Sequence, residues 1–491
     1  MRYVCTSIFP LKTMPAFMLS KQTLFFTILI LFIASIFVSC KKDKFLTEGG
    51  QINYSIDTLK FDTVFTTLGS ATRSFLLYNT NNKRIKIDQI KLQGGQNSPF
   101  RLNVDGEPTK DIHNVEIAPN DSIYIFVAVT VNPTSGNLPF IINDKVEVTL
   151  NGNQSNVALQ AYGQDAHYVV DSFLQTAVWD NDKPYVIIHS AAVDTGATLT
   201  INKGCRIYMH ADSKLYVAGR LWVFGTKEDS VIFQGDRLDR DYFGYKDYPG
   251  EWRGIHFLRS SEGSNLNYAI IKNAGLTDAA VYVEPPTVPL AGPQLEMNQC
   301  IIANSSSFGI IGLNTWIKAT NCLIHTCGLQ NLAILEGGTY EFNYCTIATF
   351  GGLGINHAQQ PTAVIYNYRD TSLTGYVGNN LQATFQNCIF YGSLDDEIIF
   401  NQKGSWNYQV TMTNCLLKRA TTVPSTLVTM NNCITNTDAD YPQFIDSYKW
   451  DYHLKSTSPL NHKGLPVPAV DRDLDRVLWN NPPSIGCYEV N

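Results

Sequence analysis

The segment 236–253, DRLDRDYFGYKDYPGEWR, concentrates the side chains of this chain that could do chemistry. It contains Asp239 and Asp241 and ends on Arg253. A glycoside hydrolase needs two carboxyl groups about 5–9.5 Å apart across a sugar. A polysaccharide lyase needs a base beside a group that neutralises the uronate. Asp239, Asp241 and Arg253 are therefore the catalytic candidates.

Aromatic residues are interleaved with these charges. Rings of this kind stack on the apolar faces of sugars while their polar atoms hydrogen-bond. The predicted glycan-binding residues are Tyr242, Tyr245, Tyr248 and Trp252. The alternative is a solvated loop whose charges neutralise one another. No nucleophile elbow or phosphate loop accompanies the segment, which favours binding over catalysis.

The other titratable groups have simpler interpretations. Asp395-Asp396-Glu397 follows an apolar run and is interpreted as a charged turn. His256, His325 and His357 lack metal-ligand spacing, so they are interpreted as ordinary surface or core histidines. No metal site and no cofactor are predicted. A Ca²⁺ ion held by carboxylates, as a lyase would use, is the alternative.

One short phrase recurs through the second half of the chain and determines the expected architecture. Its copies are LEMNQCII (295–302), IKATNCLI (317–324), YEFNYCTI (340–347), TFQNCIF (384–390), VTMTNCLL (410–417) and LVTMNNCI (427–434), after a cysteine-free LNYAII (266–271). The first three cysteines lie 22 and 23 residues apart. A period near 22 without a helical pattern is typical of a solenoid with one β-structured turn per repeat.

Each phrase holds two strands and a corner. Apolar residues alternate with period two before the cysteine, and a second alternation, one residue out of phase, starts at it. Such a slip requires a bend. The residues at the slip are Asn321, Asn387, Asn414, Asn432, Gln299 and Tyr344. Asn tolerates the left-handed conformation of a tight corner, and stacked Asn side chains are expected to hydrogen-bond between coils. The prediction is a right-handed parallel β-helix with inward-pointing cysteines.

Six cysteines occupy equivalent places in these coils. Neighbouring strands lie about 4.8 Å apart, which is within disulfide reach. Reduced thiols packed as small apolar groups are the simpler interpretation, with disulfides between coils as the alternative. A metal is disfavoured because no histidine stands in register with the thiols.

The first 40 residues have the pattern of an export signal. Lys21 precedes an apolar run, 24–38, that is too short to span a membrane, and Ser39-Cys40 follows. The segment resembles a bacterial lipoprotein signal, although Phe37 replaces the usual aliphatic residue. Lipids on Cys40 would anchor the chain to a membrane. Secretion after cleavage without a lipid is the alternative.

The remaining chain divides by pattern. The expected parts are a signal peptide at 1–39 (with 1–17 untranslated if Met18 is the start), a tether at 40–50, an immunoglobulin-like β-sandwich at 51–165, the β-helix at 166–440 and a capping module at 441–491. The module is expected to cover the strand edge of the last coil. With 43 acidic and 37 basic residues there is no basic patch, which argues against nucleic acid as a partner.

At this point a resemblance can be named. The chain is similar to a largely uncharacterised family of exported Bacteroidetes lipoproteins. The matching segments are FDTVFTTLGSATRSFLLYN (61–79), DSIYIFVAVTVNP (121–133), AYGQDAHY (161–168), GATLTINKGCRIYMH (196–210) and the tail with Ser458-Pro459, Asp471, Asp473, Ile485-Gly486 and Tyr488-Glu489. Leu474 and Ser484 depart from the family's usual Gly and Asp. The resemblance implies the same domain order and an outer-membrane lipoprotein facing the periplasm or the cell surface.

The sequence thus predicts a non-catalytic, lipid-anchored envelope protein, monomeric, that binds polysaccharide or another envelope component along a β-helix. A polysaccharide lyase or glycoside hydrolase is the first alternative. A structural or adhesive spacer is the second. Fold alone does not choose between them.

Overall fold

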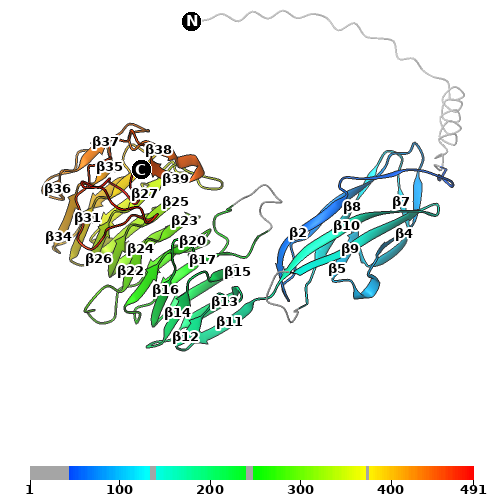
Figure 1. Cartoon of the computed structure of the whole chain (residues 1–491), viewed down its shortest axis with the longest axis horizontal. Coiled ribbons are helices and arrows are strands. Elements are labelled where there is room, and N and C mark those ends of the chain that lie inside the picture. Colours follow the sequence, from blue (N-terminus) through cyan, green and yellow to red (C-terminus); the bar gives the residue numbers. More distant parts are fainter. Residues whose placement is uncertain (1–43, 133–139, 239–246, 372–374, 491) are drawn as a thin grey trace, which may run out of the picture.

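The structure is a computed structural model that describes residues 44–132, 140–238, 247–371 and 375–490. Its regular elements are β-strands apart from short 3₁₀ turns such as η1 (Gly95–Asn97), which confirms the predicted all-β class. A sandwich (blue to cyan in Figure 1) precedes a long stack of parallel strands (green to orange).

The sandwich consists of two five-stranded sheets around an apolar core, in the orders β1-β3-β8-β5-β6 and β2-β10-β9-β4-β7. Its strands bury every second residue, as RSFLLYN does in β3. The bounds are β1 (Ile52–Tyr54), β2 (Thr58–Phe65), β3 (Arg73–Asn79), β4 (Ile85–Leu92), β5 (Phe100–Val104), β6 (Glu107–Thr109), β7 (Asp111–Ile117), β8 (Ser122–Val129), β9 (Phe140–Leu150) and β10 (Asn153–Gln164). Phe65, Val186 and Tyr208 form a small apolar core where the sandwich meets the solenoid.

From His167 to Asn436 the strands form one parallel sheet that winds into a solenoid with three faces. The first face contains β12 (Ala177–Trp179), β14 (Thr198–Asn202), β16 (Arg220–Phe224), β19 (Ser264–Asn267), β22 (Leu295–Asn298), the second halves of β24 (Ile310–Thr320) and β26 (Leu332–Asn343), β31 (Leu381–Gln386), β34 (Tyr408–Thr413) and β36 (Thr429–Asn431).

The other two faces follow on either side of it. The second face contains the first halves of β11 (His167–Leu174), β13 (Tyr185–Val193) and β15 (Arg206–Val217), then β17 (Val231–Gly235), β20 (Ala269–Lys272), β23 (Ile301–Ser305), β25 (Leu323–Cys327), β27 (Thr346–Thr349), β32 (Ile389–Gly392), β35 (Leu416–Lys418) and β37 (Ile434–Asn436). The third face contains the second halves of β11, β13 and β15, then β18 (Gly254–Phe257), β21 (Val281–Val283), the first halves of β24 and β26, β28 (Ala363–Tyr366) and β33 (Ile398–Asn401).

The corners between the first and second faces lie where the phase slip predicts them. The slip residues adopt positive φ angles between 50° and 55°: Gln299, Asn321, Tyr344, Asn387, Asn414 and Asn432. Tyr268 has the same role in the cysteine-free copy, with φ 46°. The prediction of left-handed corners is confirmed.

The Asn side chains do not bond to one another, which corrects the expectation of an Asn ladder between coils. Three of them, Asn321, Asn387 and Asn414, bind the C-terminal segment instead. Asn321 donates to the carbonyl of Arg472 at 2.7 Å, and Asn414 donates to that of Lys463 at 2.8 Å. The column of corners is therefore the attachment line of the C-terminal module.

That module lies along the side of the solenoid rather than over its end. Leu460, Leu474, Ile485 and further apolar residues pack on the outer surface of the second face. Its two strands, β38 (Phe444–Asp446) and β39 (Asp451–Leu454), pair only with each other in the described part of the chain. The expectation that 441–491 covers the strand edge of the last coil is wrong. The residues of β36 and β37, the strands of that coil, remain exposed or partly exposed.

The segment 359–380 contains three short strands. β28 continues the third face, and β29 (Tyr368–Thr371) and β30 (Gly375–Gly378) form an antiparallel hairpin. Ala363 and Ile365 of β28 fill the core of the solenoid. Within this segment, only the β29–β30 hairpin therefore leaves the solenoid.

Candidate ligand-binding groove

The structure describes only part of the segment that the sequence singles out. Tyr248 is 39 % exposed. Four predicted site residues fall in the stretch 239–246, outside the described residues, so their roles stay predictions: Asp239, Asp241, Tyr242 and Tyr245. The predicted lipidation site, Cys40, also lies outside the described residues.

Trp252 is not available to a sugar. Its side chain is fully buried in the solenoid core. Its indole N–H donates to the carbonyl of Lys272 at 2.9 Å. The predicted glycan-binding role of Trp252 is wrong, because the residue fills the interior just before β18.

Arg253 belongs to a set of paired charges near the third face. Its guanidinium lies 2.9 Å from the carboxylate of Asp212. Two neighbouring pairs are Lys214 with Asp278 at 2.9 Å and His256 with Glu284 at 3.1 Å. Burial and the charge of Lys214 lower the pKa of His256. Arg253 and Lys214 each have a carboxylate of the protein itself as their partner. This pairing disfavours Arg253 as a group that neutralises a substrate.

The first face presents a polar outer surface because its strands alternate. In β22, Leu295 and Met297 are buried whereas Glu296 and Asn298 point outward. The parallel register stacks such outward positions into columns that run from coil to coil. One column is Trp222, Asn265, Glu296, Lys318, Glu341, Thr384 and Thr411, and the next is Phe224, Asn267, Asn298, Thr320, Asn343, Gln386 and Thr413.

Two large aromatic side chains lie early in these columns, one coil after Thr200 and Asn202. Trp222 is 39 % exposed and Phe224 is 48 % exposed. Their ring centroids are 6.5 Å apart in an edge-to-face arrangement. The indole N–H of Trp222 donates to the carbonyl of Gly263 at 3.0 Å, which holds the ring in place. Aromatic rings beside hydrogen-bonding groups are suited to sugar recognition.

The charges on this surface are arranged in pairs. Lys318 lies 3.1 Å from Glu296 in the neighbouring strand, and Arg220 pairs with Glu262. Opposite charges on adjacent strands stabilise the sheet modestly and leave little net field for a charged ligand.

Two hollows deepen the first face. One, of about 360 Å³, lies between Arg220, Glu296 and the turn 290–293. The other, of about 460 Å³, lies between Lys318, Asn343 and the C-terminal segment 467–472. Glu296 lines both hollows, so they adjoin. We call the outward columns with these two walls the first-face groove.

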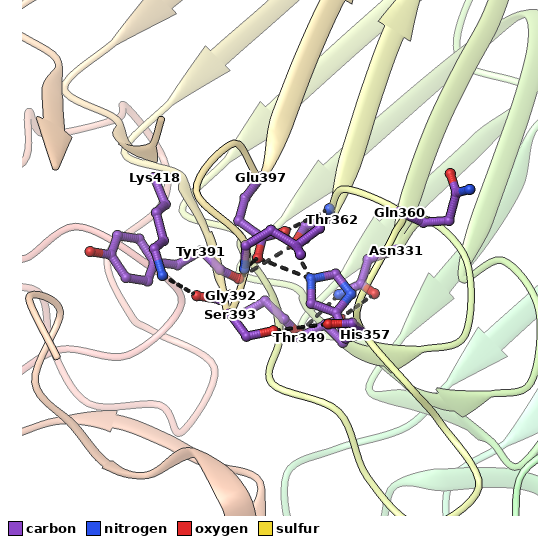
Figure 2. A network of polar contacts seen from close by, with 12 residues as sticks. Asn331, Thr349, His357, Gln360, Thr362, Tyr391, Gly392, Ser393, Glu397 and Lys418 are labelled. Carbon is purple, nitrogen blue, oxygen red and sulfur yellow. Dashed lines mark hydrogen bonds and ion pairs between the residues drawn. The ribbon is translucent and has the colours of Figure 1, made fainter. Parts of the chain in front are cut away.

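A buried polar network near the end of the solenoid has a different role. Figure 2 shows Glu397, which is fully buried, accepting from Nε2 of His357 at 2.9 Å and from the hydroxyl of Thr362 at 2.6 Å. Nearby, the buried Lys418 donates to the carbonyl of Gly392 at 2.7 Å. Because both oxygens of Glu397 accept hydrogen bonds inside the protein, the network stabilises the fold.

This network corrects one prediction and supports another. Glu397 is a core residue, not part of a solvated turn. His357 is a core histidine, as expected. Asp396 does fit a charged turn, since it accepts from the hydroxyl of Thr421 at 2.6 Å. Burial by itself would raise the pKa of the Asp396 carboxyl. The bond from Thr421 and the bonds from backbone N–H groups outweigh burial, so the pKa of Asp396 is lowered.

The sequence contains a signal for Trp222 and Phe224 that the predictions above did not use. In RLWVF of β16, Leu221 and Val223 are the buried residues, so the two rings lie on the outward side of the strand. Aromatic residues at the outward positions of an otherwise polar face mark a contact surface. Only the register between coils shows that they share two columns with polar side chains.

Comparisons with known proteins show distant fold likeness only. No family model and no curated protein matches the chain. The catalytic unit of a family 87 α-1,3-glucanase from Streptomyces thermodiastaticus has 9 % identity over 74 % of this chain and 89 % of its own, with a TM-score of 0.28. The catalytic domain of a family 87 α-1,3-glucanase in complex with nigerose has 9 % identity over 74 % and 87 %, with a TM-score of 0.17.

A family 123 glycoside hydrolase from Clostridium perfringens has 10 % identity over 23 % of this chain, with a TM-score of 0.17. The match spans about a quarter of that hydrolase, 26 % of its length. At these TM-scores the similar structures assign neither an activity nor a site to this chain.

No group of three or more His, Cys, Asp or Glu side chains within 44–132, 140–238, 247–371 and 375–490 could hold a metal ion. In the same ranges no helix is long and apolar enough to cross a membrane.

Proposed function

We propose that this protein is a lipid-anchored component of the cell envelope that binds an uncharged polysaccharide in the first-face groove without cleaving it. The observation that carries the proposal is the pair of exposed rings, Trp222 and Phe224, next to which the later coils place amide, hydroxyl and carboxylate side chains in register. A sugar needs both an apolar platform and hydrogen-bonding partners.

The columns favour a polymer over a single sugar. Equivalent positions recur in successive coils about 4.8 Å apart. Asn267, Asn298 and Asn343 thus offer similar groups along the solenoid axis, with the buried Thr320 between the last two. A chain of sugars running along this axis would meet the same kind of partner at each step.

The pairing of charges supports an uncharged ligand and a non-catalytic role. Glu296 is neutralised by Lys318, and Glu262 by Arg220. A hydrolase would need one carboxyl group kept protonated and a second one free to act on the sugar or on water. A polysaccharide lyase or hydrolase is the second candidate function, carried by Asp239 and Asp241 should they face a substrate.

The remaining parts have supporting roles in this proposal. Acyl chains on Cys40 anchor the protein in the outer membrane, facing the periplasm or the cell surface, and the sandwich, proposed to be immunoglobulin-like, holds the right-handed β-helix away from it. Replacing Cys40 with Ser and following the incorporation of labelled fatty acid tests the anchor. Unchanged labelling would contradict it.

The binding itself is tested by a glycan-array screen on residues 41–491, followed by assays of product release from each glycan bound. The variant with Trp222→Ala and Phe224→Ala should lose about 2 kcal/mol of binding energy, roughly 30-fold in affinity, at about 1 kcal/mol per ring. Tyr448→Ala is the matched control, because Tyr448 is a 79 % exposed aromatic residue in the C-terminal module.

Each outcome separates the candidates. Binding that the double variant loses and the control keeps supports the groove. New reducing ends or unsaturated uronates would make the protein an enzyme. Absence of both binding and release would leave a structural or adhesive spacer.

A further inference from the structure

Six cysteine side chains form a continuous column inside the solenoid. They belong to successive coils, and none is in a disulfide: Cys300, Cys322, Cys345, Cys388, Cys415 and Cys433. Each thiol donates to a main-chain carbonyl of the preceding coil. For example, Cys415 donates to Phe385 and Cys433 to Met412, both at 3.4 Å.

The register places the last two thiols opposite each other. Leu416 pairs with Ile434 and Thr413 with Asn431, so Cys415 and Cys433 face each other across adjacent parallel strands. The strand spacing of about 4.8 Å lies within the Cα separation of about 4.4–6.8 Å that a disulfide spans.

Access to the column is restricted to its end. Of the nine cysteines in the described part of the chain, Cys433 alone is partly exposed, and the others are buried. The reason is the uncovered edge of the last coil, where no strand within the described ranges pairs with the outer side of β37. Complete burial keeps a disulfide reagent away from the inner thiols of the column.

We propose that Cys433 and Cys415 are an oxidisable dithiol that reacts with disulfides at the open end of the solenoid, leaving the four inner thiols of the column reduced. The co-reactant is a small disulfide, RSSR, or the disulfide of an exported thiol oxidase. The inference does not depend on glycan binding.

The reaction is a two-step thiol–disulfide exchange. The Cys433 thiolate attacks RSSR, forming Cys433–S–S–R and releasing one thiolate. The Cys415 thiolate then attacks the Cys433 sulfur, forming the Cys415–Cys433 disulfide and releasing the second thiolate. The two protons of the cysteines end on two RSH molecules, so RSSR is reduced as the protein is oxidised.

The product would close the last coil covalently. The disulfide would join the residues that directly precede β35 and β37 and so close the segment 416–432, whose tip at 421–427 is largely exposed. Linking the ends of such a segment restricts its opening. Hydrogen exchange in β37 should therefore slow on oxidation.

The experiment treats folded residues 41–491 with excess oxidised glutathione, alkylates the free thiols after denaturation and maps the products by peptide mass spectrometry. We expect a peptide pair joined through Cys415 and Cys433, two hydrogens lighter than the reduced pair. Cys415→Ser should trap glutathione on Cys433, and Cys433→Ser should leave the column reduced. Cys487→Ser, a change at a buried thiol outside the column, is the control and should oxidise like the wild type.

The opposite results overturn the proposal. One is glutathione that stays on Cys433 of the wild type without reaching Cys415. Another is equal oxidation of the column in Cys433→Ser. A folded wild type that stays fully reduced, while the urea-unfolded chain oxidises under the same conditions, would show that the column is structural only.

Discussion

Replacing Asn387 with Ala should loosen the C-terminal module from the solenoid. Asn387 is fully buried at a corner with φ 55°. Its side-chain amide donates to the carbonyl of Leu465 at 2.7 Å and accepts from the N–H of Leu465 at 2.8 Å. Two hydrogen bonds at about 1 kcal/mol each and a left-handed Ala at about 1 kcal/mol give a loss of about 3 kcal/mol.

Native-state hydrogen exchange at the Leu465 amide measures this loss locally, because the module can open without unfolding of the whole chain. A loss of about 3 kcal/mol corresponds to a protection roughly 150-fold lower. Asn387→Gly removes the hydrogen bonds but not the backbone preference, so it should cost about 2 kcal/mol.

Asn432→Ala is the matched control. Asn432 has φ 52° but an exposed side chain, so the substitution should cost only the conformational term of about 1 kcal/mol, in the last coil. Unchanged protection at Leu465 in Asn387→Ala, or equal effects of the two Ala variants on that amide, would refute the attachment line.

Three further predictions concern stability. Glu397→Gln should lower the free energy of unfolding by about 3 kcal/mol, because an amide cannot accept every bond that the carboxylate does; an unchanged urea midpoint would contradict this. The hydrogen bond to the carboxylate of Asp475 raises the pKa of His453. The stability that the protonated His453 contributes is therefore complete below about pH 6.5 and is lost as the pH rises through the raised pKa. Melting temperatures across this range should show the decline in the wild type and not in His453→Asn. Trp252→Ala should cost about 3–5 kcal/mol as a core truncation while the folded protein keeps its glycan affinity; weaker binding with normal stability would restore Trp252 as a ligand contact.

The features that the sequence predicts correctly are those that local geometry encodes. Alternation in LEMNQCII specifies which residues of β22 are buried, and the phase slip at Gln299 specifies a corner whose backbone must be left-handed. Both are properties of neighbouring residues, and each copy of the phrase repeats them.

The features that the sequence misses depend on contacts between distant segments. Nothing near Asn387 shows that its side chain meets Leu465 rather than the next Asn. Glu397 stands in an acidic triplet typical of a turn, and only the approach of His357 and Thr362 gives it partners in the interior. The side position of the C-terminal module likewise depends on packing across many coils.

The prediction for Trp252 fails for a related reason. Trp252 lies among charged residues that are typical of an exposed loop, yet it enters the core just before β18. Trp222 lies in an ordinary strand, and its value as a platform depends on the polar columns of later coils. The cluster of charged and aromatic residues at 236–253 was therefore a poorer guide to exposed aromatic side chains than the positions that stack from coil to coil.

The most direct test of the account measures the affinity of residues 41–491 for oligosaccharides of increasing length from the glycan that the array identifies. If the ligand lies along the first-face groove, affinity should rise with each added sugar over several coils and then level off. Trp222→Ala should weaken every member of the series by about five-fold, the equivalent of about 1 kcal/mol. Affinity that does not depend on length, or that Trp222→Ala leaves unchanged, would contradict binding in the groove.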